Sequence, residues 1–352
     1  MRDKPRKVLV FLLKIAVTAF LLVYLFRTKD IDLRKAFAVI GAADLWVLFG
    51  AFWLLMVGQY LCSIRWGMLL AHLGIRIRQW RLFQFYLIGM FFSNFFPSII
   101  GGDVVKIFYV KRDSGRPLMY AFAATYLERA AGFVALLGFG IAGSLYHPYA
   151  LGAADFRPIG WLGLREVPLW AVVAALTVLF LAANAVLFSR RLYRWTVRLL
   201  ERVRLAKLGG KIAQMGEAMH AFRRRPAALV WPTVLSFVNI GMFITMNWLF
   251  AKALGLAVPF PVLAAIVSVI VVLVMLPISI NGLGLRETAF VVFLLPVVGD
   301  TPDHAARLVA LSLLNFLSAV ISSLPGSLCY SLLKRETALD DIERELADDR
   351  PA

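Results

Sequence analysis

Six long apolar stretches restrict the fold of this chain more than any other feature. A helix needs roughly 20 apolar residues to cross about 30 Å of hydrocarbon. Stretches of about that length are Val8–Phe26, Leu45–Cys62, Leu118–Tyr146, Pro168–Phe188, Ala227–Leu254 and Ala305–Leu333. Because the bilayer core offers backbone groups no hydrogen-bond partner, each stretch must satisfy its own within a helix. The sequence therefore predicts an all-α, polytopic membrane helix bundle.

Two further apolar stretches are interrupted. Phe83–Val110 and Phe260–Pro296 each carry a proline, a glycine cluster and charged residues near the middle. Such breaks are typical of re-entrant segments, which enter and leave the membrane on the same side. We therefore expect six full spans plus two re-entrant hairpins.

The distribution of Lys and Arg predicts the orientation. With a cytoplasmic N-terminus, the expected inner segments hold 27 of these residues and the expected outer loops hold 6. The inner segments are 1–7, 63–83, 106–117, 189–226 and 334–352, and the outer loops are 27–43, 147–167, 255–258 and 297–304. This positive-inside pattern accounts for the net charge of +17 without a nucleic-acid partner. It predicts a bacterial inner-membrane protein with both termini in the cytoplasm.

We expect one membrane domain over 1–333, followed by a charged cytoplasmic tail over 334–352. Within the domain, arginines recur every four residues from Arg190 to Arg202. Segment 189–226 is therefore predicted to form a basic amphipathic helix. Either this helix binds anionic headgroups on the inner leaflet, or it is a solvated loop helix that only fixes the topology.

The two interrupted stretches contain an internal repeat. Phe96–Asp103 reads apolar, Pro, three residues and a small pair before a charged helix start, and Leu276–Leu283 has a similar order 180 residues later. The halves 8–146 and 168–333 then each hold three spans and one hairpin. Because three is odd, the second half enters the membrane upside down. This predicts an inverted-topology repeat with a site near the midplane.

Ionisable side chains within the apolar segments suggest the site. Inserting each one costs roughly 2.5–3.5 kcal/mol, so each requires a partner or a function. Asp103 and Lys106 share a helix face, whereas the neighbours Glu128 and Arg129 point roughly 100° apart. We expect pairing between elements, for example Glu128 with Arg286. Two interpretations stay open: closed ion pairs that fix packing, or cations that bind an anionic headgroup.

Glycines precede both predicted helix starts, as Gly101-Gly102 and as Gly282-x-Gly284. Unpaired N–H groups at a helix start carry partial positive charge and suit a phosphate. Asn281 either satisfies the broken backbone or simply caps the hairpin. The candidate substrate-binding residues are Arg65, Gly101, Gly102, Asp103, Lys106, Arg112, Glu128, Arg129, Asn281, Gly282, Gly284, Arg286 and Glu287.

Three motifs carry a family resemblance. They are Pro-Ser-Ile-Ile-Gly-Gly-Asp-Val-Val-Lys at 97–106, Glu-Arg-Ala-Ala-Gly at 128–132 and Asn-Gly-Leu-Gly-Leu-Arg-Glu at 281–287. With these motifs in order, residues 8–333 resemble the flippase-like membrane domain of lysylphosphatidylglycerol synthases. The resemblance implies a role in moving an amphiphilic lipid or lipid-linked headgroup between leaflets. Bifunctional members carry an aminoacyl-transferase domain after this region, where this chain has a 19-residue tail, so we do not expect synthase activity.

We therefore expect a lipid translocator that moves an anionic phospholipid or a lipid-linked headgroup, and not an enzyme. The sequence contains no nucleotide, metal or cofactor motif, so movement would be downhill, ion-coupled or driven by a partner. Membrane lipids are the expected partners. The alternatives are an integral-membrane enzyme acting on a lipid headgroup and a non-transporting lipid-binding partner of a lipid-synthesis enzyme.

Overall fold

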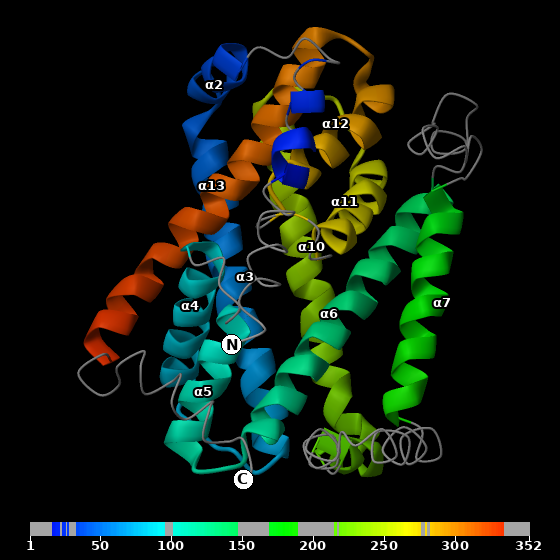
Figure 1. The fold of residues 1–352 in the computed structure, drawn as a ribbon. Coiled ribbons are helices and arrows are strands. Elements are labelled where there is room, and N and C mark those ends of the chain that lie inside the picture. Colours follow the sequence, from blue (N-terminus) through cyan, green and yellow to red (C-terminus); the bar gives the residue numbers. More distant parts are fainter. Residues whose placement is uncertain are drawn as a thin grey trace. The chain divides into compact units, whose positions relative to one another are not determined.

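The chain folds into helices throughout its described part. The computed structural model describes residues 16–21, 23–25, 27, 33–95, 101–146, 169–188, 215–216, 218–275, 279 and 282–333, and none of them lies in a strand. The α-helices, labelled in Figure 1, are α2 (Leu33–Gly41), α3 (Leu45–His72), α4 (Gln79–Phe95), α5 (Gly102–Ser114), α6 (Leu118–Tyr146), α7 (Leu169–Phe188), α10 (Val230–Ala253), α11 (Phe260–Met275), α12 (Leu285–Val298) and α13 (Pro302–Leu333). A 3₁₀ turn, Pro226–Leu229, precedes α10. The predicted all-α class is confirmed for these residues.

Among the described residues, four helices are long and apolar enough to cross a membrane. They cover Leu45–His72, Leu118–Leu145, Pro226–Ala253 and Pro302–Leu333. Helix α7 has 20 residues and begins one residue after the expected start of its span. Helical residues also occur between 16 and 27, while 8–15 lie outside the described ranges. The chain is therefore a multi-pass membrane protein, and the number of six spans stays a prediction.

Helix α3 is longer than expected. We expected the span to end at Cys62, but the helix continues to His72. The added turns carry Trp66, Leu69 and Leu70, each 0% exposed. Burial of these side chains extends the helix, because about 1.5–3 kcal/mol is gained for each large apolar side chain removed from water. As a result, Arg65 lies within a helix as a buried residue and not in an inner-surface loop.

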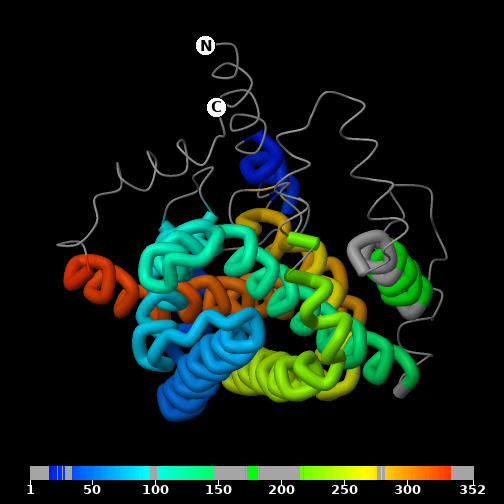
Figure 2. Tube along the Cα trace, turned by 90° about the horizontal axis from the view of Figure 1, so that it is seen from below, coloured from blue at the N-terminus to red at the C-terminus, as the bar shows by residue number. Residues whose placement is uncertain are grey.

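Both interrupted stretches form pairs of short helices. Helix α4 has 17 residues and α5 has 13, while α11 has 16 and α12 has 14. At 1.5 Å per residue the longest is about 26 Å, shorter than the hydrocarbon core. Helix α4 lies beside α5 (Figures 1 and 2), and α11 contacts α12. Pro97 and Pro277, which were expected at the breaks between these helices, lie outside the described residues.

The chain divides into two compact units, and each contains one of these helix pairs. Unit 1 consists of Met1–Met56, Leu136–Ala175 and Gly241–Ile321, and unit 2 of Val57–Ala135, Leu176–Ile240 and Ser322–Ala352. Each unit thus draws residues from both expected halves, 8–146 and 168–333. The units follow spatial contacts, whereas the expected halves follow the order of elements along the chain.

The core of unit 2 is aromatic and aliphatic. Trp66, Phe85 and Tyr109 are fully buried, and the Phe85 and Tyr109 rings stack with centroids 5.1 Å apart. Helices α4 and α5 can approach closely because Gly102 has no Cβ atom. A Cβ at this position would overlap the carbonyl oxygen of Gly89. This close contact positions α5, which carries part of the candidate site.

In unit 1, helix α11 is buried over most of its surface. Every residue from Val262 to Ile270 is buried. A helix surrounded by protein must be apolar on all sides, not only along one stripe. This explains why the sequence of α11 is apolar apart from Ser268, whose hydroxyl donates a hydrogen bond to the Ala264 carbonyl oxygen.

Little of the expected basic helix over 189–226 is described. Residues 189–214 lie outside the described ranges, and so does the tail over 334–352. The described end of the segment is helical up to Arg224, with Met219 and Phe222 buried and Arg223 to Arg225 exposed. The arginines from Arg190 to Arg202, on which the prediction of a basic amphipathic helix depends, lie outside the described residues, so this helix stays a prediction.

Candidate functional site

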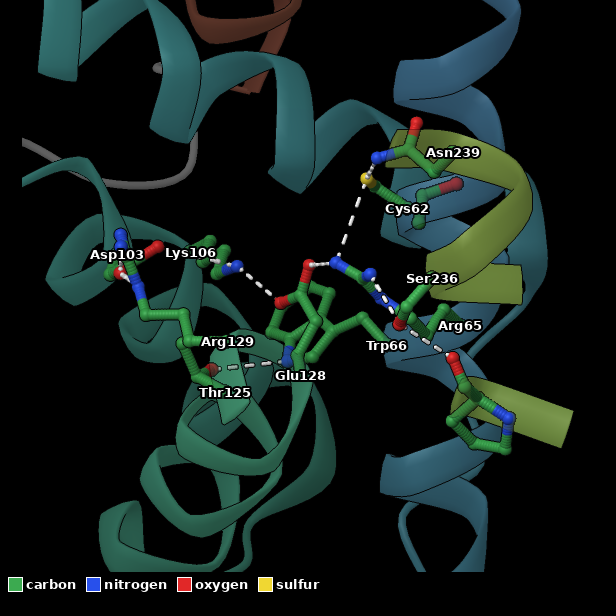
Figure 3. Close-up of polar contacts among 12 residues, drawn as sticks. Cys62, Arg65, Trp66, Asp103, Lys106, Thr125, Glu128, Arg129, Ser236 and Asn239 are labelled. Atoms are coloured by element: carbon green, nitrogen blue, oxygen red, sulfur yellow. Dashed lines mark hydrogen bonds and ion pairs between the residues drawn. The ribbon is translucent and has the colours of Figure 1, made fainter. Parts of the chain in front are cut away.

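Five charged side chains meet inside unit 2. We call Arg65, Asp103, Lys106, Glu128 and Arg129 the charge cluster (Figure 3). Arg65 comes from α3, Asp103 and Lys106 from α5, and Glu128 and Arg129 from α6. The sequence predicted all five as site residues, and the fold brings them together.

Glu128 lies at the centre of the charge cluster. Its Oε2 accepts a hydrogen bond from Lys106 Nζ at 2.8 Å, and its Oε1 accepts one from Arg65 Nη2 at 3.1 Å. The side chains of all three residues are at most 7% exposed. The expected pairing between elements is confirmed, but the expected partner Arg286 was wrong. Arg286 belongs to unit 1, and two cations of unit 2 occupy the carboxylate.

The charge cluster continues towards solvent-accessible surface through Asp103. Lys106 Nζ lies 3.3 Å from Asp103 Oδ1, in the i, i+3 contact that the sequence predicted. Asp103 also pairs with Arg129. Glu128 and Arg129 diverge as expected, because the side chain of Glu128 is 3% exposed and that of Arg129 is 59% exposed. The ion pairs therefore form a chain from a buried end at Arg65 to an accessible end at Arg129.

Side chains that were not predicted as site residues hold the two buried cations. Lys106 Nζ lies 4.8 Å from the Trp66 ring centroid and 4.7 Å from that of Tyr86. Arg65 Nη1 donates to Ser236 Oγ at 2.7 Å, which ties α3 to α10. Aromatic faces and hydroxyl groups stabilise cations that have left water. Trp66 adjoins Arg65 in the sequence, but no local pattern pointed to Ser236.

Two smaller contacts complete the surroundings of Arg65 and Trp66. Asn239 Nδ2 donates to Cys62 Sγ at 3.2 Å, and Trp66 Nε1 donates to Thr125 Oγ1 at 3.1 Å. Figure 3 shows these side chains around the central carboxylate. These contacts link α3 to α10 and to α6 on either side of Arg65 in the sequence.

The charge cluster has more positive than negative charge. Three cations and two carboxylates leave a formal excess of one positive charge. The excess is most accessible at Arg129, because the other cations are buried. The arrangement is therefore suited to holding one anionic group at its Arg129 end.

Of the two glycines at the start of α5, Gly102 serves packing. The N–H of Gly102 donates to Ser93 Oγ at 3.2 Å, so this donor is already used, contrary to our expectation of a vacant helix start. Gly102 contacts Gly89, whereas a Cβ atom on Gly101 would meet nothing within 4 Å. Side-chain cations, and not the first amide of α5, therefore offer the better anion site.

The second expected helix start lies in unit 1 and is also occupied. Gly284 N–H donates to Glu287 Oε2 at 2.6 Å. Gly282 and Gly284 have φ angles of 75° and 78°, a region that costs other residues about 1–2 kcal/mol. The turn therefore accounts for both glycines. Asn281 lies outside the described residues.

Arg286 and Glu287 are near neighbours in space. Arg286 Nε lies 3.7 Å from Glu287 Oε1, and the same oxygen accepts a hydrogen bond from Ser312 Oγ at 2.9 Å. Glu287 therefore contacts α13 through a neutral serine, and its ion pair among the described residues is with Arg286 of its own helix and not with a charged residue of another element.

Arg112 lies apart from the charge cluster along α5. Its Nε is 3.6 Å from Asp113 Oδ1, and its guanidinium lies 5.6 Å from the Tyr109 ring centroid. These contacts are typical of a surface arginine at a helix end. Among the described residues, no group of three or more His, Cys, Asp or Glu side chains is placed to hold a metal ion.

The helices and the buried charge cluster define a multi-pass membrane protein with ion pairs between its helices. Residues 11–328 match the family model of the lysylphosphatidylglycerol synthase transmembrane region, and the chain belongs to this family. The chain is also similar to the UPF0104 membrane protein MJ1595 of Methanocaldococcus jannaschii. The two are 22% identical over 296 residues, which cover 81% of this chain and 84% of that protein.

Proposed function

We propose that this protein moves an anionic phospholipid or a lipid-linked anionic headgroup between the leaflets of a bacterial inner membrane. The observation that carries the proposal is the positive excess of the charge cluster in a membrane helical unit. Charged side chains in membrane segments are costly and mark substrate pathways. The membership of a family linked to lipid handling supports the same conclusion.

In this proposal, the headgroup binds first at Arg129. An anionic oxygen competes with Asp103 for the exposed guanidinium, while Lys106 lies behind Asp103 at 3.3 Å. The buried pair of Glu128 with Lys106 stays closed and keeps the cation fixed. The acyl chains remain in the bilayer, so that only the headgroup needs a polar environment. The role is transport and involves no chemical change of the lipid.

The helix pairs support the inverted repeat as part of the proposal. Helices α4 and α5 have 17 and 13 residues, and α11 and α12 have 16 and 14. Each pair is too short to be read as two ordinary spans. We interpret them as re-entrant hairpins of two halves that alternate in exposing the site, with both termini in the cytoplasm.

Lipid exchange in reconstituted vesicles tests the function. Full-length protein is placed in vesicles containing fluorescent nitrobenzoxadiazole-labelled phosphatidylglycerol or phosphatidylcholine, and dithionite reports the label in the outer leaflet. We expect labelled phosphatidylglycerol to exchange faster than in protein-free vesicles. Exchange of both probes at the protein-free rate would contradict translocation and favour a lipid-binding partner or an enzyme.

The Arg129→Gln substitution is expected to slow phosphatidylglycerol exchange about tenfold, since a hydrogen bond to a charged group contributes about 1.5–3 kcal/mol. Its effect on stability should be small, because an exposed ion pair contributes only about 0–1 kcal/mol. Exchange rates and thermal unfolding of the same preparation provide the two measurements.

Arg81→Gln is the matched control for Arg129→Gln. Arg81 forms another Arg–Asp pair with α5, through Asp113, and its side chain is 37% exposed. This variant should exchange lipid at the wild-type rate. If both variants lose exchange equally, or if Arg129→Gln exchanges as fast as wild type, the headgroup does not bind at Arg129.

A further inference from the structure

Unit 1 contains a cavity that the charge cluster does not use. It has a volume of about 210 Å³ and lies among α10, α11, α12 and α13. Its wall is apolar except for Arg286 and Asn315. This volume exceeds the roughly 150 Å³ of a cavity that binds benzene and is below the usual range for drug-sized ligands. It fits a segment of an alkyl chain.

Arg286 brings unused hydrogen-bond donors to this cavity. Its Nε and Nη2 are buried and have no hydrogen-bond partner within the described part of the chain. The Phe316 ring centroid lies 5.4 Å from the guanidinium carbon, so an aromatic face covers one side of the group. Leaving such a donor unsatisfied costs about 1–3 kcal/mol, and more for a charged group. Nε and Nη2 of Arg286 therefore require a hydrogen-bond acceptor that the described residues do not provide.

The neighbouring polar groups do not supply that acceptor. Glu287 Oε1 lies 3.7 Å from Arg286 Nε, beyond hydrogen-bond length, and accepts from Ser312. Asn315 uses both of its amide hydrogens, on Asn247 Oδ1 at 2.9 Å and on the Leu311 carbonyl oxygen at 3.0 Å. Among the described residues that line the cavity, Arg286 is thus a side chain with unused hydrogen-bond donors.

The charge balance selects the kind of acceptor. Arg286 and Glu287 carry opposite charges 3.7 Å apart, so this pair is formally neutral. An anionic oxygen at Arg286 would be repelled by the Glu287 carboxylate, whereas a neutral carbonyl oxygen would not. The site therefore differs from the charge cluster, which has a positive excess.

From these observations we infer that the unit 1 cavity holds an acyl chain of a glycerolipid, with the neutral ester carbonyl oxygen accepting hydrogen bonds from Arg286. The apolar wall receives the first part of the chain, and the guanidinium receives the ester. This assignment does not depend on translocation, because a lipid that stays bound to unit 1 would make the same contacts.

Photocrosslinking of full-length protein tests the inference. The probe is phosphatidylcholine with diazirine-bearing ester-linked chains, and the comparison probe is its dialkyl ether analogue, which lacks both carbonyl groups. We expect the ester probe to label cavity residues of α11, such as Val267 and Val274, about tenfold more than the ether probe, the effect of one hydrogen bond to a charged group. Peptide mass spectrometry locates the label. Equal labelling by the two probes would overturn the inference.

Two variants distinguish the ester contact at Arg286 from the cavity volume that the acyl chain occupies. Arg286→Met should remove the preference for the ester probe, and Ala319→Leu, which fills the cavity while keeping Arg286, should abolish labelling by both probes. Retained ester preference in Arg286→Met, or full labelling of Ala319→Leu, would contradict the assignment. Only variants that elute as folded protein on size exclusion are compared.

Two further measurements identify the chemical form of the ligand and separate this inference from the proposed function. A diazirine-bearing palmitate tests the carboxylate form of the same chain, and stronger Arg286-dependent labelling by palmitate than by the diester would overturn the neutral-ester assignment. Arg129→Gln should label like wild type, because Arg129 belongs to unit 2. Loss of exchange in Arg129→Gln with unchanged labelling would support both sites independently.

Discussion

Glu128→Gln is expected to destabilise the protein by about 3–5 kcal/mol, the typical cost of removing one partner from a buried ion pair. Glutamine keeps the shape of the side chain but leaves Arg65 and Lys106 buried beside a neutral group, with side chains 7% and 5% exposed. The free energy of unfolding in mixed micelles, measured by titration with a denaturing detergent, provides the readout. A loss below about 1 kcal/mol would show that the carboxylate does not hold the two cations.

The double variant Arg65→Met with Glu128→Gln sharpens this experiment. It removes one cation and one anion, so the charge excess returns to the wild-type value, and Lys106 keeps Asp103 at 3.3 Å. We expect the double variant to be more stable than the sum of the two single changes, by about 0.5–3 kcal/mol, as for residues that share one network. Additive effects would mean that Arg65 and Glu128 act independently.

Gly102→Ala is expected to destabilise the protein by up to about 3 kcal/mol, at the upper end of the usual overpacking cost. The new methyl group would overlap the Gly89 carbonyl oxygen and Ser93 Oγ, and a backbone oxygen cannot move without shifting α4. In an ordinary helix the same change stabilises by about 0.5–1 kcal/mol. The sign of the change in unfolding free energy therefore reports the α4–α5 contact directly.

Gly101→Ala is the matched control for Gly102→Ala. Gly101 has φ −58° and ψ 150°, which alanine also adopts, and an added Cβ would meet nothing within 4 Å. We expect a change of at most about 0.5 kcal/mol. Equal destabilisation by both substitutions would show that the Gly-Gly pair serves the turn and not the approach of the two helices.

Composition and local spacing determined much of this protein. The long apolar stretches predicted helices, and the two interrupted stretches predicted pairs of shorter helices around proline and glycine. The i, i+3 spacing placed Asp103 beside Lys106, and the i, i+1 spacing separated Glu128 from Arg129. These inferences succeeded because helix geometry alone decides which residues share a face.

The sequence did not determine which helices meet. It gave Glu128 the wrong partner, ended α3 at Cys62 instead of His72, and did not predict that Gly102 packs against Gly89. A search for all polar residues in apolar segments would have singled out Asn239 as a candidate, but not its contact.

The sequence by itself therefore determined that the chain crosses a membrane as helices and which residues are charged within them. Only the tertiary structure decided that Glu128 joins Arg65 to Lys106. It also decided that two nitrogen donors of Arg286 lie beside an apolar cavity without a hydrogen-bond partner among the described residues. Periodicity is a property of a few neighbouring residues. Ion pairing and cavities depend on side-chain packing between helices far apart in the sequence.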